Sequence, residues 1–223
     1  MAKVLIIFGI IYTSMNTYVL DTNLFFNMEA GFDMGEKTES VIVNLTRIIK
    51  SLQGRQQDVF LMPPKIVDEL LSFFDDENQS FLKEFLAHIT VKSPDLYAMQ
   101  IPAILLAQYI DESRTRNYRG QTICEEEMLN VGRQMVGIES LDKKGFEMKV
   151  GPVVRHFRDR YRQATRFGFV DSVADLELIL LAKEQEAFLI STDEGVLKWG
   201  KILGVKEMSA AVFGKKIRDE TAV

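Results

Sequence analysis

Apolar and polar positions along the chain follow two repeating patterns, one typical of strands and one typical of helices, and together these patterns predict the secondary structure. Short apolar runs at 17–20 and 59–62 predict buried strands. Between them, apolar residues recur every three to four positions from Ser40, which predicts an amphipathic helix that ends at Gly54. Pro63-Pro64 then opens a second helix. The order strand, helix, strand, helix predicts a parallel sheet whose functional edge lies at the carboxyl ends of its strands.

The same alternation returns near the C-terminus. A helix is predicted to begin at Asp171, and the run 187–190 predicts a strand that ends at Ser191-Thr192-Asp193. A short helix over 195–199 and a small strand near Val205 complete the pattern. We expect these elements to join the N-terminal ones in a single sheet.

The residues between the two α/β segments have a purely helical pattern. One helix is predicted over 96–116, with a kink at Pro102 and a turn at Gly120. A second carries an apolar stripe from Cys124 to Ile138 and is expected to end at Gly145 or Gly151. At a rise of ~1.5 Å per residue, arms of about 20 residues would reach about 30 Å. The predicted organisation is an α/β domain in two parts, 15–91 and 151–223, interrupted by an inserted, protruding helical hairpin at 92–150.

Composition narrows the class of protein. The chain has 223 residues, 47% of them apolar and 26% charged, which excludes a disordered or fibrous protein. The net charge of −5 argues against a protein that coats nucleic acid indiscriminately, although a local basic patch remains compatible with it. A single cysteine, Cys124, excludes an internal disulfide and a Cys-rich zinc module, so we expect a reducing, cytoplasmic location.

The N-terminus carries an apolar run at 4–12 that is similar to the core of a signal peptide. It is much shorter than the ~20 residues that cross a bilayer, and no A-x-A cleavage site follows it. We favour an upstream extension, with Met15 as the functional start. No other stretch is long and apolar enough to span a membrane, so we expect no membrane association.

Four aspartates occupy positions that a parallel sheet would bring together. Two of them follow strands, and the other two are four residues apart, on one face of the first turn of a helix. Like charges held close together require protonation or a cation. A set of oxygen ligands without histidine or thiolate favours Mg²⁺ or Mn²⁺, and ions held in this way promote phosphodiester hydrolysis. The candidate ligands are Asp21, Asp171, Asp175 and Asp193, with Glu69 as a fifth.

Each of these residues also has a structural alternative. Asp21 could shape a turn, whereas Asp171 and Asp193 could cap helices. Glu69 has Asp68 as its neighbour, and the two could lie on a solvated helix face. Four carboxylates at mutually consistent places favour the metal centre.

Two groups of arginines are candidate RNA-binding residues. The first follows i, i+3, i+7, i+11 spacing along one side of a helix that ends at Gly168, and planar guanidinium groups suit phosphate. The second accompanies Tyr118 at the expected tip of the hairpin. Solvated helix and loop surfaces, with partners such as Asp159, are the alternatives. The two groups are Arg155, Arg158, Arg162 and Arg166, and Arg114, Arg116 and Arg119.

The sequence resembles a known family at four blocks of residues. These are Tyr18 to Asn23, the Pro-Pro motif followed by Glu69-Leu70, Phe169 to Asp175, and Ile190 to Gly195. The first and last blocks resemble PIN-domain nucleases in general. The full set, with the long helical insertion and the arginine-rich segment, is similar to the HARP family of minimal protein-only ribonuclease P, also known as RNA ligase partner proteins. The resemblance covers the chain from Met15 onward, and the apolar N-terminal extension departs from it.

The resemblance implies a PIN-like parallel sheet sandwiched by helices. It implies endonucleolytic removal of the 5′ leader from precursor tRNA without an RNA subunit, leaving 5′-phosphomonoester ends. The same four aspartates would be catalytic, and a homo-oligomer is expected. The alternatives are a toxin-type PIN endoribonuclease, which is usually compact, and a non-catalytic RNA-binding partner of an RNA ligase, which the intact set of aspartates disfavours.

Overall fold

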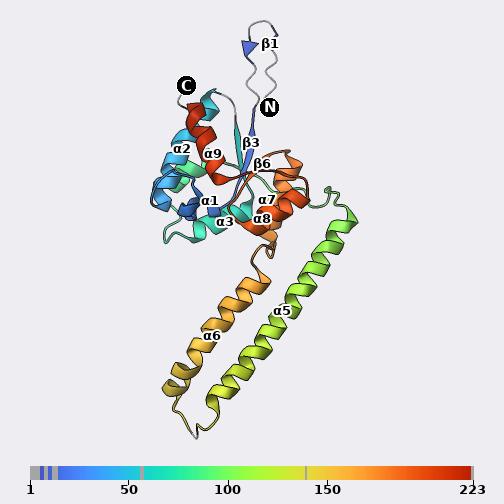
Figure 1. Ribbon diagram of the computed structural model, residues 1–223. Helices are drawn as coiled ribbons and strands as arrows, with labels where there is room; N and C mark the ends of the chain where they lie inside the picture. Colours follow the sequence, from blue (N-terminus) through green and yellow to red (C-terminus); the bar gives the residue numbers. More distant parts are fainter. Residues whose placement is uncertain (1–5, 8–9, 12–14, 56–57, 139, 222–223) are drawn as a thin grey trace. The chain divides into compact units, whose positions relative to one another are not determined.

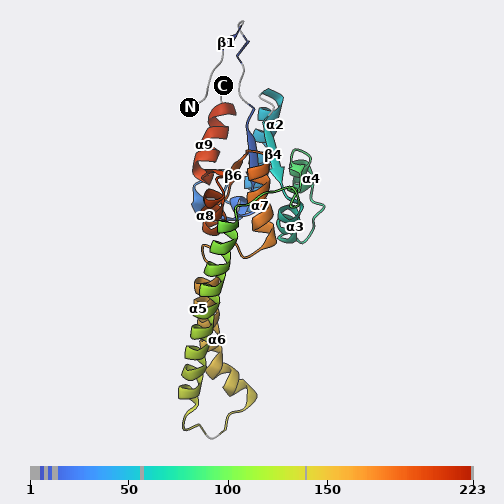
Figure 2. The ribbon, with the colours of Figure 1, turned by 90° about the vertical axis from the view of Figure 1, so that its right-hand side faces the viewer.

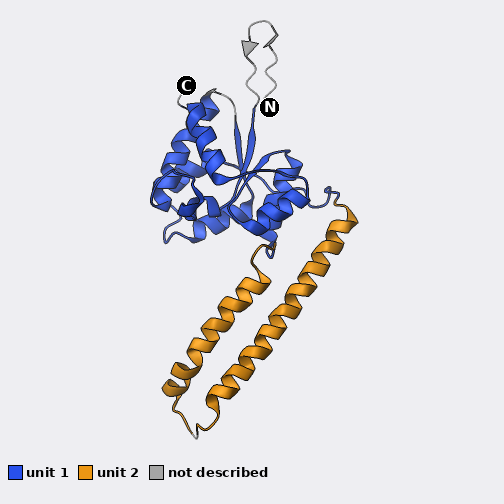
Figure 3. Ribbon diagram, viewed as in Figure 1, with its two compact units in different colours: residues 1–100, 170–223 blue, residues 101–169 orange. Residues whose placement is uncertain are grey.

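The computed structural model describes residues 6–7, 10–11, 15–55, 58–138 and 140–221 (Figure 1). The chain forms two compact units, coloured separately in Figure 3. Unit 1 combines residues 1–100 with 170–223, and unit 2 comprises Ile101–Phe169. Two distant segments of the sequence therefore build one unit, as the returning α/β pattern predicts.

Unit 1 is built on a five-stranded sheet in which every neighbouring pair of strands is parallel, so the predicted α/β class is confirmed. The strand order β5-β4-β3-β6-β7 places the first strand after Met15 at the centre of the sheet. Its carboxyl end therefore lies beside those of β4 and β6. The strands are β3 (Thr17–Leu20), β4 (Val59–Met62), β5 (Thr90–Val91), β6 (Phe188–Ile190) and β7 (Lys206–Met208).

Helices cover both faces of this sheet. Figure 1 shows α2 and α9 on one side of the strands and α7 and α8 on the other, and Figure 2 shows α3 and α4 towards the β4 side of the sheet. The helices of unit 1 are α1 (Asn23–Phe26), the 3₁₀ turn η1 (Met28–Ala30), α2 (Thr38–Arg55), α3 (Pro64–Ser72), α4 (Ser80–Leu86), α7 (Val173–Glu184), α8 (Glu194–Ile202) and α9 (Ala210–Thr221).

An aromatic row crosses the three central strands. Tyr18 of β3 lies in register with Phe60 of β4 and Phe188 of β6, and its ring stacks on theirs at centroid distances of 5.3 and 5.9 Å. Phe213 of α9 packs on the same ring at 5.1 Å. Tyr18 is fully buried, so this row fixes the register of the strands whose ends carry the candidate carboxylates.

Unit 2 is a hairpin of two long antiparallel helices, α5 (Ala103–Met135) and α6 (Lys143–Thr165) (Figure 1). The predicted turn at Gly120 is wrong, because α5 continues through this residue. A Cβ atom on Gly120 would lie 2.7 Å from Cε2 of Tyr161 and 3.1 Å from Cγ2 of Thr165, both on α6. The glycine therefore permits a close approach of two helices, and the turn follows Met135.

The ends of the hairpin also differ from the prediction. Pro102 is the N-cap of α5 and does not kink it. Gly145 lies in the first turn of α6, where its N–H donates to the N-cap Asp142 at 2.8 Å, and Gly151 lies in the interior of the same helix. Unit 2 spans 101–169, whereas the predicted hairpin spanned 92–150, because the turn lies later in the sequence than Gly120.

The N-terminal segment contains the two-residue strands β1 (Ile6–Ile7) and β2 (Ile10–Ile11), which pair antiparallel. The prediction that residues 1–14 are an extension concerns residues that lie mostly outside the described ones. Within the described residues, no helix combines the length and the apolarity that crossing a bilayer requires.

Candidate functional site

The five candidate carboxylates belong to unit 1 and lie at the carboxyl edge of its sheet. Asp21 follows β3, and Glu69 belongs to α3, the helix after β4. Asp193 follows β6 and is the N-cap of α8. Asp171 precedes α7, and Asp175 lies in its first turn. The sheet order places β4 and β6 on either side of β3, so this edge gathers residues that are up to 172 positions apart in the sequence.

Asp21 is the buried centre of the group, with an exposed fraction of 2%. Its Oδ2 accepts a hydrogen bond from the Ser191 hydroxyl and one from Nδ2 of Asn23 at 3.3 Å, and its Oδ1 accepts from the Thr22 hydroxyl at 3.3 Å. Burial raises the pKa of Asp21, and the nearby charge of Asp193 raises it further, whereas the hydrogen bonds from Ser191 and Asn23 lower it. These hydrogen bonds thus fix the Asp21 side chain in a buried place that disfavours its negative charge.

Ser191 links the ends of β3 and β6. It donates to Asp21, and its Oγ accepts a hydrogen bond from the backbone N–H of Asp193 at 3.0 Å. The residue is 1% exposed. Sequence reasoning treated Ser191 only as the end of a strand and missed this role. The available signal was a hydroxyl residue two positions before Asp193, directly after an apolar strand.

Asp175 is half-buried in the first turn of α7. Burial raises its pKa to about 6, and the charges of Asp21, Asp193 and Asp171 contribute to the shift, against a hydrogen bond with Ser172. Ser172 is also the N-cap, with its Oγ accepting from the Asp175 N–H at 3.0 Å. The predicted helix start at Asp171 is therefore wrong by two residues, and the capping role suggested for Asp171 belongs to Ser172.

Glu69 and Asp68 are both exposed on α3, and Glu69 interacts electrostatically with the carboxylate of Asp21. Burial raises the pKa of Glu69, the charge of Asp21 raises it further, and a hydrogen bond with the Thr22 hydroxyl lowers it. Glu69 is therefore within electrostatic range of the buried carboxylate at the end of β3. This coupling supports Glu69 as the member of the group.

Asp193 caps the helix that follows it, which is one of the two roles that its position in the sequence suggested. Its Oδ1 accepts a hydrogen bond from the N–H of Val196 at 2.9 Å, which caps α8. The carboxylate has a second oxygen, and its charge contributes to the raised pKa of both Asp21 and Asp175. Capping fixes the orientation of this side chain and leaves it acceptor capacity towards the edge of the sheet.

The donor set fits a hard divalent ion. It offers carboxylate oxygens only, and among the described residues no lysine or arginine forms an ion pair with Asp21, Glu69, Asp175 or Asp193. In the same part of the chain, no three acidic, histidine or cysteine side chains stand close enough to share one ion as they are. The carboxylates would have to move closer together to ligate a common cation.

The arginines of the first candidate group lie on α6 and at its end. Arg155, Arg158 and Arg162 are exposed, and none of them forms an ion pair within the described residues, so the pairing with Asp159 that the alternative interpretation suggested is absent there. Arg166 is the C-cap of α6. Three guanidinium groups at i, i+3, i+7 spacing therefore face solvent on the return arm of the hairpin.

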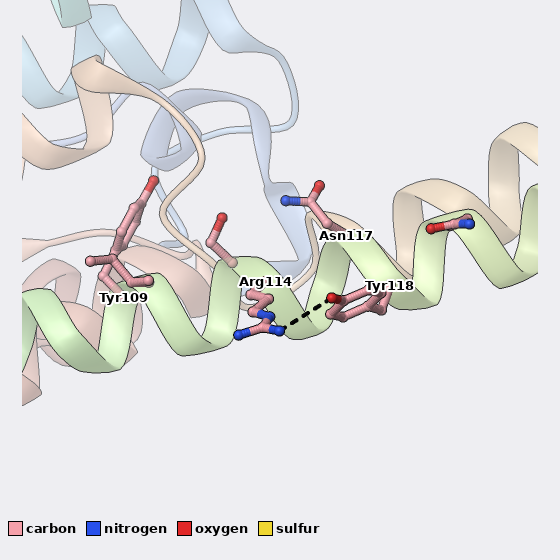
Figure 4. A pocket seen from close by; sticks show the side chains of 7 residues that line it. Tyr109, Arg114, Asn117 and Tyr118 are labelled. Carbon is pink, nitrogen blue, oxygen red and sulfur yellow. Dashed lines mark hydrogen bonds between the residues drawn. The ribbon is translucent and has the colours of Figure 1, made fainter.

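The second candidate group lies in the middle of α5, because the turn follows Met135, and not at the tip of the hairpin. Arg114 and Tyr118 help to line a cavity of about 440 Å³ on this helix (Figure 4), and Arg114 donates to the Tyr118 hydroxyl at 3.3 Å. Arg119 is exposed. These two arginines remain available on the surface of unit 2.

Arg116 is engaged within the hairpin. Its guanidinium pairs with Glu112 at 2.8 Å, donates to the Phe167 carbonyl at 2.9 Å and lies 4.8 Å from the centroid of the Phe169 ring. The side chain is only 13% exposed. These contacts hold the end of α6 against α5, so the structure gives Arg116 a packing role that sequence reasoning missed.

A second polar contact between α5 and α6 was also missed. Glu127 is 7% exposed, and its Oε1 accepts from Nη1 of Arg160 at 2.8 Å and lies 3.0 Å from Nδ1 of His156. Arg160 also pairs with Glu126 at 2.6 Å. The hydrogen bond from Arg160 lowers the pKa of Glu127. Arg160 therefore belongs to the packing of the hairpin, although its neighbours Arg158 and Arg162 are exposed.

Known proteins match this chain over almost all of the helices and strands described above. The family model described as PINc domain ribonuclease matches residues 17–221. The RNA-free ribonuclease P of Thermococcus onnurineus is 33% identical over 196 residues, which cover 88% of this chain and 90% of that protein. The proteins of the same name from Archaeoglobus fulgidus and Pyrococcus abyssi are 32% and 31% identical and cover 91% and 92% of this chain. These matches cover 90% and 93% of the two relatives.

Proposed function

Because the chain belongs to the family of PINc domain ribonucleases, we propose that it is an RNA-free ribonuclease P, a hydrolase that removes the 5′ leader of precursor tRNA without an RNA subunit. The observation that carries this proposal is the extent of the match. Unit 2 makes up roughly a third of the chain, so an alignment over 88% of the chain includes a large part of the hairpin. A compact toxin-type ribonuclease would match unit 1 alone.

Nucleases of this family generally work with divalent metal ions. We propose Mg²⁺, or Mn²⁺ in its place, held by Asp21, Asp171, Asp175 and Asp193, with Glu69 close by. When bound, the ion would neutralise charge on the phosphoryl oxygens and acidify a water molecule for attack on the phosphodiester. The chain's own contribution is orientation: its hydroxyl and amide donors fix Asp21, and the cap of α8 fixes Asp193.

The exposed arginines of α6 supply the complementary charge for the RNA backbone. Arg155, Arg158 and Arg162 would each neutralise a phosphate, which makes binding dependent on salt. Met128 and Leu129 of α5 are exposed large apolar residues, a feature that supports assembly into a homo-oligomer through the hairpin. We propose that the enzyme acts in the cytoplasm, where tRNA precursors are processed.

The test is cleavage of a precursor tRNA with a 5′ leader, with and without Mg²⁺, followed by mapping of the product ends. Asp193→Asn keeps a good helix cap and removes one negative charge, so it should fold normally. Its cleavage rate should fall by about three orders of magnitude, since charge stabilisation by a metal contributes several kcal/mol. Binding of the RNA in EDTA should change little. Full activity in Asp193→Asn would remove this residue from the metal centre.

A matched pair of variants tests Glu69. Glu69→Gln removes a carboxylate that interacts with Asp21, whereas Asp68→Asn removes the neighbouring exposed carboxylate. Only the first should lower the cleavage rate. Cuts inside the mature tRNA would indicate the toxin-type activity, and binding without cleavage by the wild-type chain would indicate a non-catalytic RNA-binding protein.

A further inference from the structure

A cavity of about 600 Å³ lies in unit 1 where three segments meet, and its lining includes none of the five candidate carboxylates. Its walls come from the loop that precedes α2, from one face of α2 and from the end of α9. From α2 it takes residues at i, i+3, i+4 and i+7 spacing, which share one helix face. These are Asn44, Arg47, Ile48 and Ser51.

Two arginines line this cavity, and neither has a carboxylate partner among the described residues. Arg47 is exposed, and its Nη2 donates a long hydrogen bond of 3.4 Å to Oδ1 of Asn44. Arg218 donates through Nη1 to two backbone carbonyls, at 2.8 and 3.2 Å. In a protein with a net charge of −5, two guanidinium groups without ion-pair partners, with one carboxylate among the described residues of the lining, mark a place that favours an anion.

The wall opposite α2 is built in advance of any ligand. Arg218 holds the carbonyls of Phe32 and Asp33, and Nδ2 of Asn44 donates to the carbonyl of Met34 at 2.7 Å. Asp33 has a positive φ of 54°, which is uncommon outside glycine. A Cβ on Gly214 would lie 2.5 Å from the Phe32 carbonyl oxygen, so α9 approaches this loop as closely as glycine allows. The cavity therefore needs little ordering when a ligand enters.

We propose that this cavity binds a phosphate group, carried either by a free mononucleotide or by the backbone of an RNA. Guanidinium groups donate two parallel hydrogen bonds to phosphate, and Ser51 adds a hydroxyl donor to the lining. Met34 and Ile48 give the apolar surface that an attached sugar or base requires. The proposal is independent of the proposed cleavage activity, because it predicts binding and not turnover.

Asp33 gives the proposal its sharpest test, because it is the one carboxylate among the described residues of the lining. It repels an anion, so Asp33→Asn should strengthen phosphate binding severalfold, whereas it would weaken the binding of a cation. Asparagine tolerates positive φ as well as aspartate does, so the loop should keep its conformation.

The experiment is titration calorimetry of the full chain with inorganic phosphate and with adenosine 5′-monophosphate, in EDTA and at constant ionic strength. Arg47→Ala should weaken both ligands about tenfold, the factor that one charge-assisted hydrogen bond provides. Arg218→Lys keeps the positive charge, loses the planar fork and should also weaken binding. Lys215→Ala removes an exposed cation of α9 that does not line the cavity and should have no effect.

A final arm distinguishes the two sources of phosphate. If the ligand is an RNA backbone, Arg47→Ala lowers the slope of log affinity for precursor tRNA against log salt by about one. If the ligand is a free nucleotide, that slope is unchanged while binding of adenosine 5′-monophosphate is weakened. Phosphate, nucleotide and RNA affinities that are all equal in wild type and Arg47→Ala would overturn the proposal, as would equal losses in Lys215→Ala.

Discussion

Replacing Asp175 by Asn should make the metal-free protein more stable while it removes activity. The structure raises the pKa of Asp175 from its usual 3.8 to about 6, chiefly through burial. A pKa difference of one corresponds to about 1.36 kcal/mol, so ionising this group in the fold costs at most about 3 kcal/mol. Asp175 is only half-buried, and solvent screening reduces this cost to about 1–2 kcal/mol. The positive end of the helix dipole lies at the N-terminus of α7 and stabilises a negative charge there by about 0.3–1 kcal/mol. We therefore expect a net gain of about 1 kcal/mol for Asp175→Asn.

The direction of the pH dependence follows from the same raised pKa. The pKa is higher in the folded protein than in the unfolded chain, so the folded state binds the proton more tightly. The destabilisation by Asp175 is absent below about pH 4, grows as the pH rises through about 6 and is complete above about pH 7. The stabilities of wild type and Asp175→Asn should therefore converge at about pH 4 and separate at about pH 7.5.

Urea denaturation in EDTA at both pH values measures this difference. Adding Mg²⁺ at the higher pH should stabilise wild type, by about 2.7 kcal/mol at roughly one hundred times the dissociation constant, and should stabilise Asp175→Asn less. The Asp175 N–H bond to the Ser172 cap persists in the variant, so α7 keeps its start. A variant that is less stable than wild type at the higher pH, or a difference that does not change with pH, would refute the reasoning.

Two further predictions concern packing within each unit. Gly132→Ala in α5 meets no atom within 4 Å and should stabilise the protein by about 0.5–1 kcal/mol, whereas Gly120→Ala should destabilise it by about 1 kcal/mol because its Cβ contacts Tyr161. Equal gains at both sites, measured by circular dichroism during urea denaturation, would contradict the close approach of α5 and α6. In unit 1, Lys65 pairs with the buried Glu177, so Lys65→Ala should cost about 1–3 kcal/mol. Adding Glu177→Gln should recover part of that loss in a double-mutant cycle, and additive losses would show that the pair is uncoupled.

The strands, and the edge of the sheet at which they end, were predictable because neighbouring residues in the sequence mark where each strand begins and ends. The strands at 17–20 and 59–62 have the predicted bounds, since each is an apolar run that ends in turn-forming residues. In a parallel sheet, the order of elements also fixes which ends meet. Asp21, Asp193 and Asp175 could therefore be assigned to the same edge of the sheet from sequence alone.

The hairpin was harder to predict because a glycine has two opposite uses in a helical segment. Gly120 could end a helix or allow a second helix to approach closely, and only contacts with Tyr161 and Thr165 distinguish these uses. Both contact residues are more than 40 positions away, so no local pattern contains them. The same limit concealed Arg116, whose role depends on the carbonyl of Phe167.

The capping and metal-binding interpretations of the aspartates were treated as alternatives in sequence, yet the structure makes them compatible. Asp193 uses Oδ1 to cap α8, and its charge still raises the pKa of Asp21. A capping carboxylate at a strand end has a fixed orientation, and its second oxygen retains acceptor capacity. A cap that served stability alone would not lie where its charge opposes that of a buried neighbour, because that placement costs free energy. The capped carboxylate beside the buried Asp21 therefore supports the proposal that Asp193 belongs to a cation-binding site and does not serve helix capping alone.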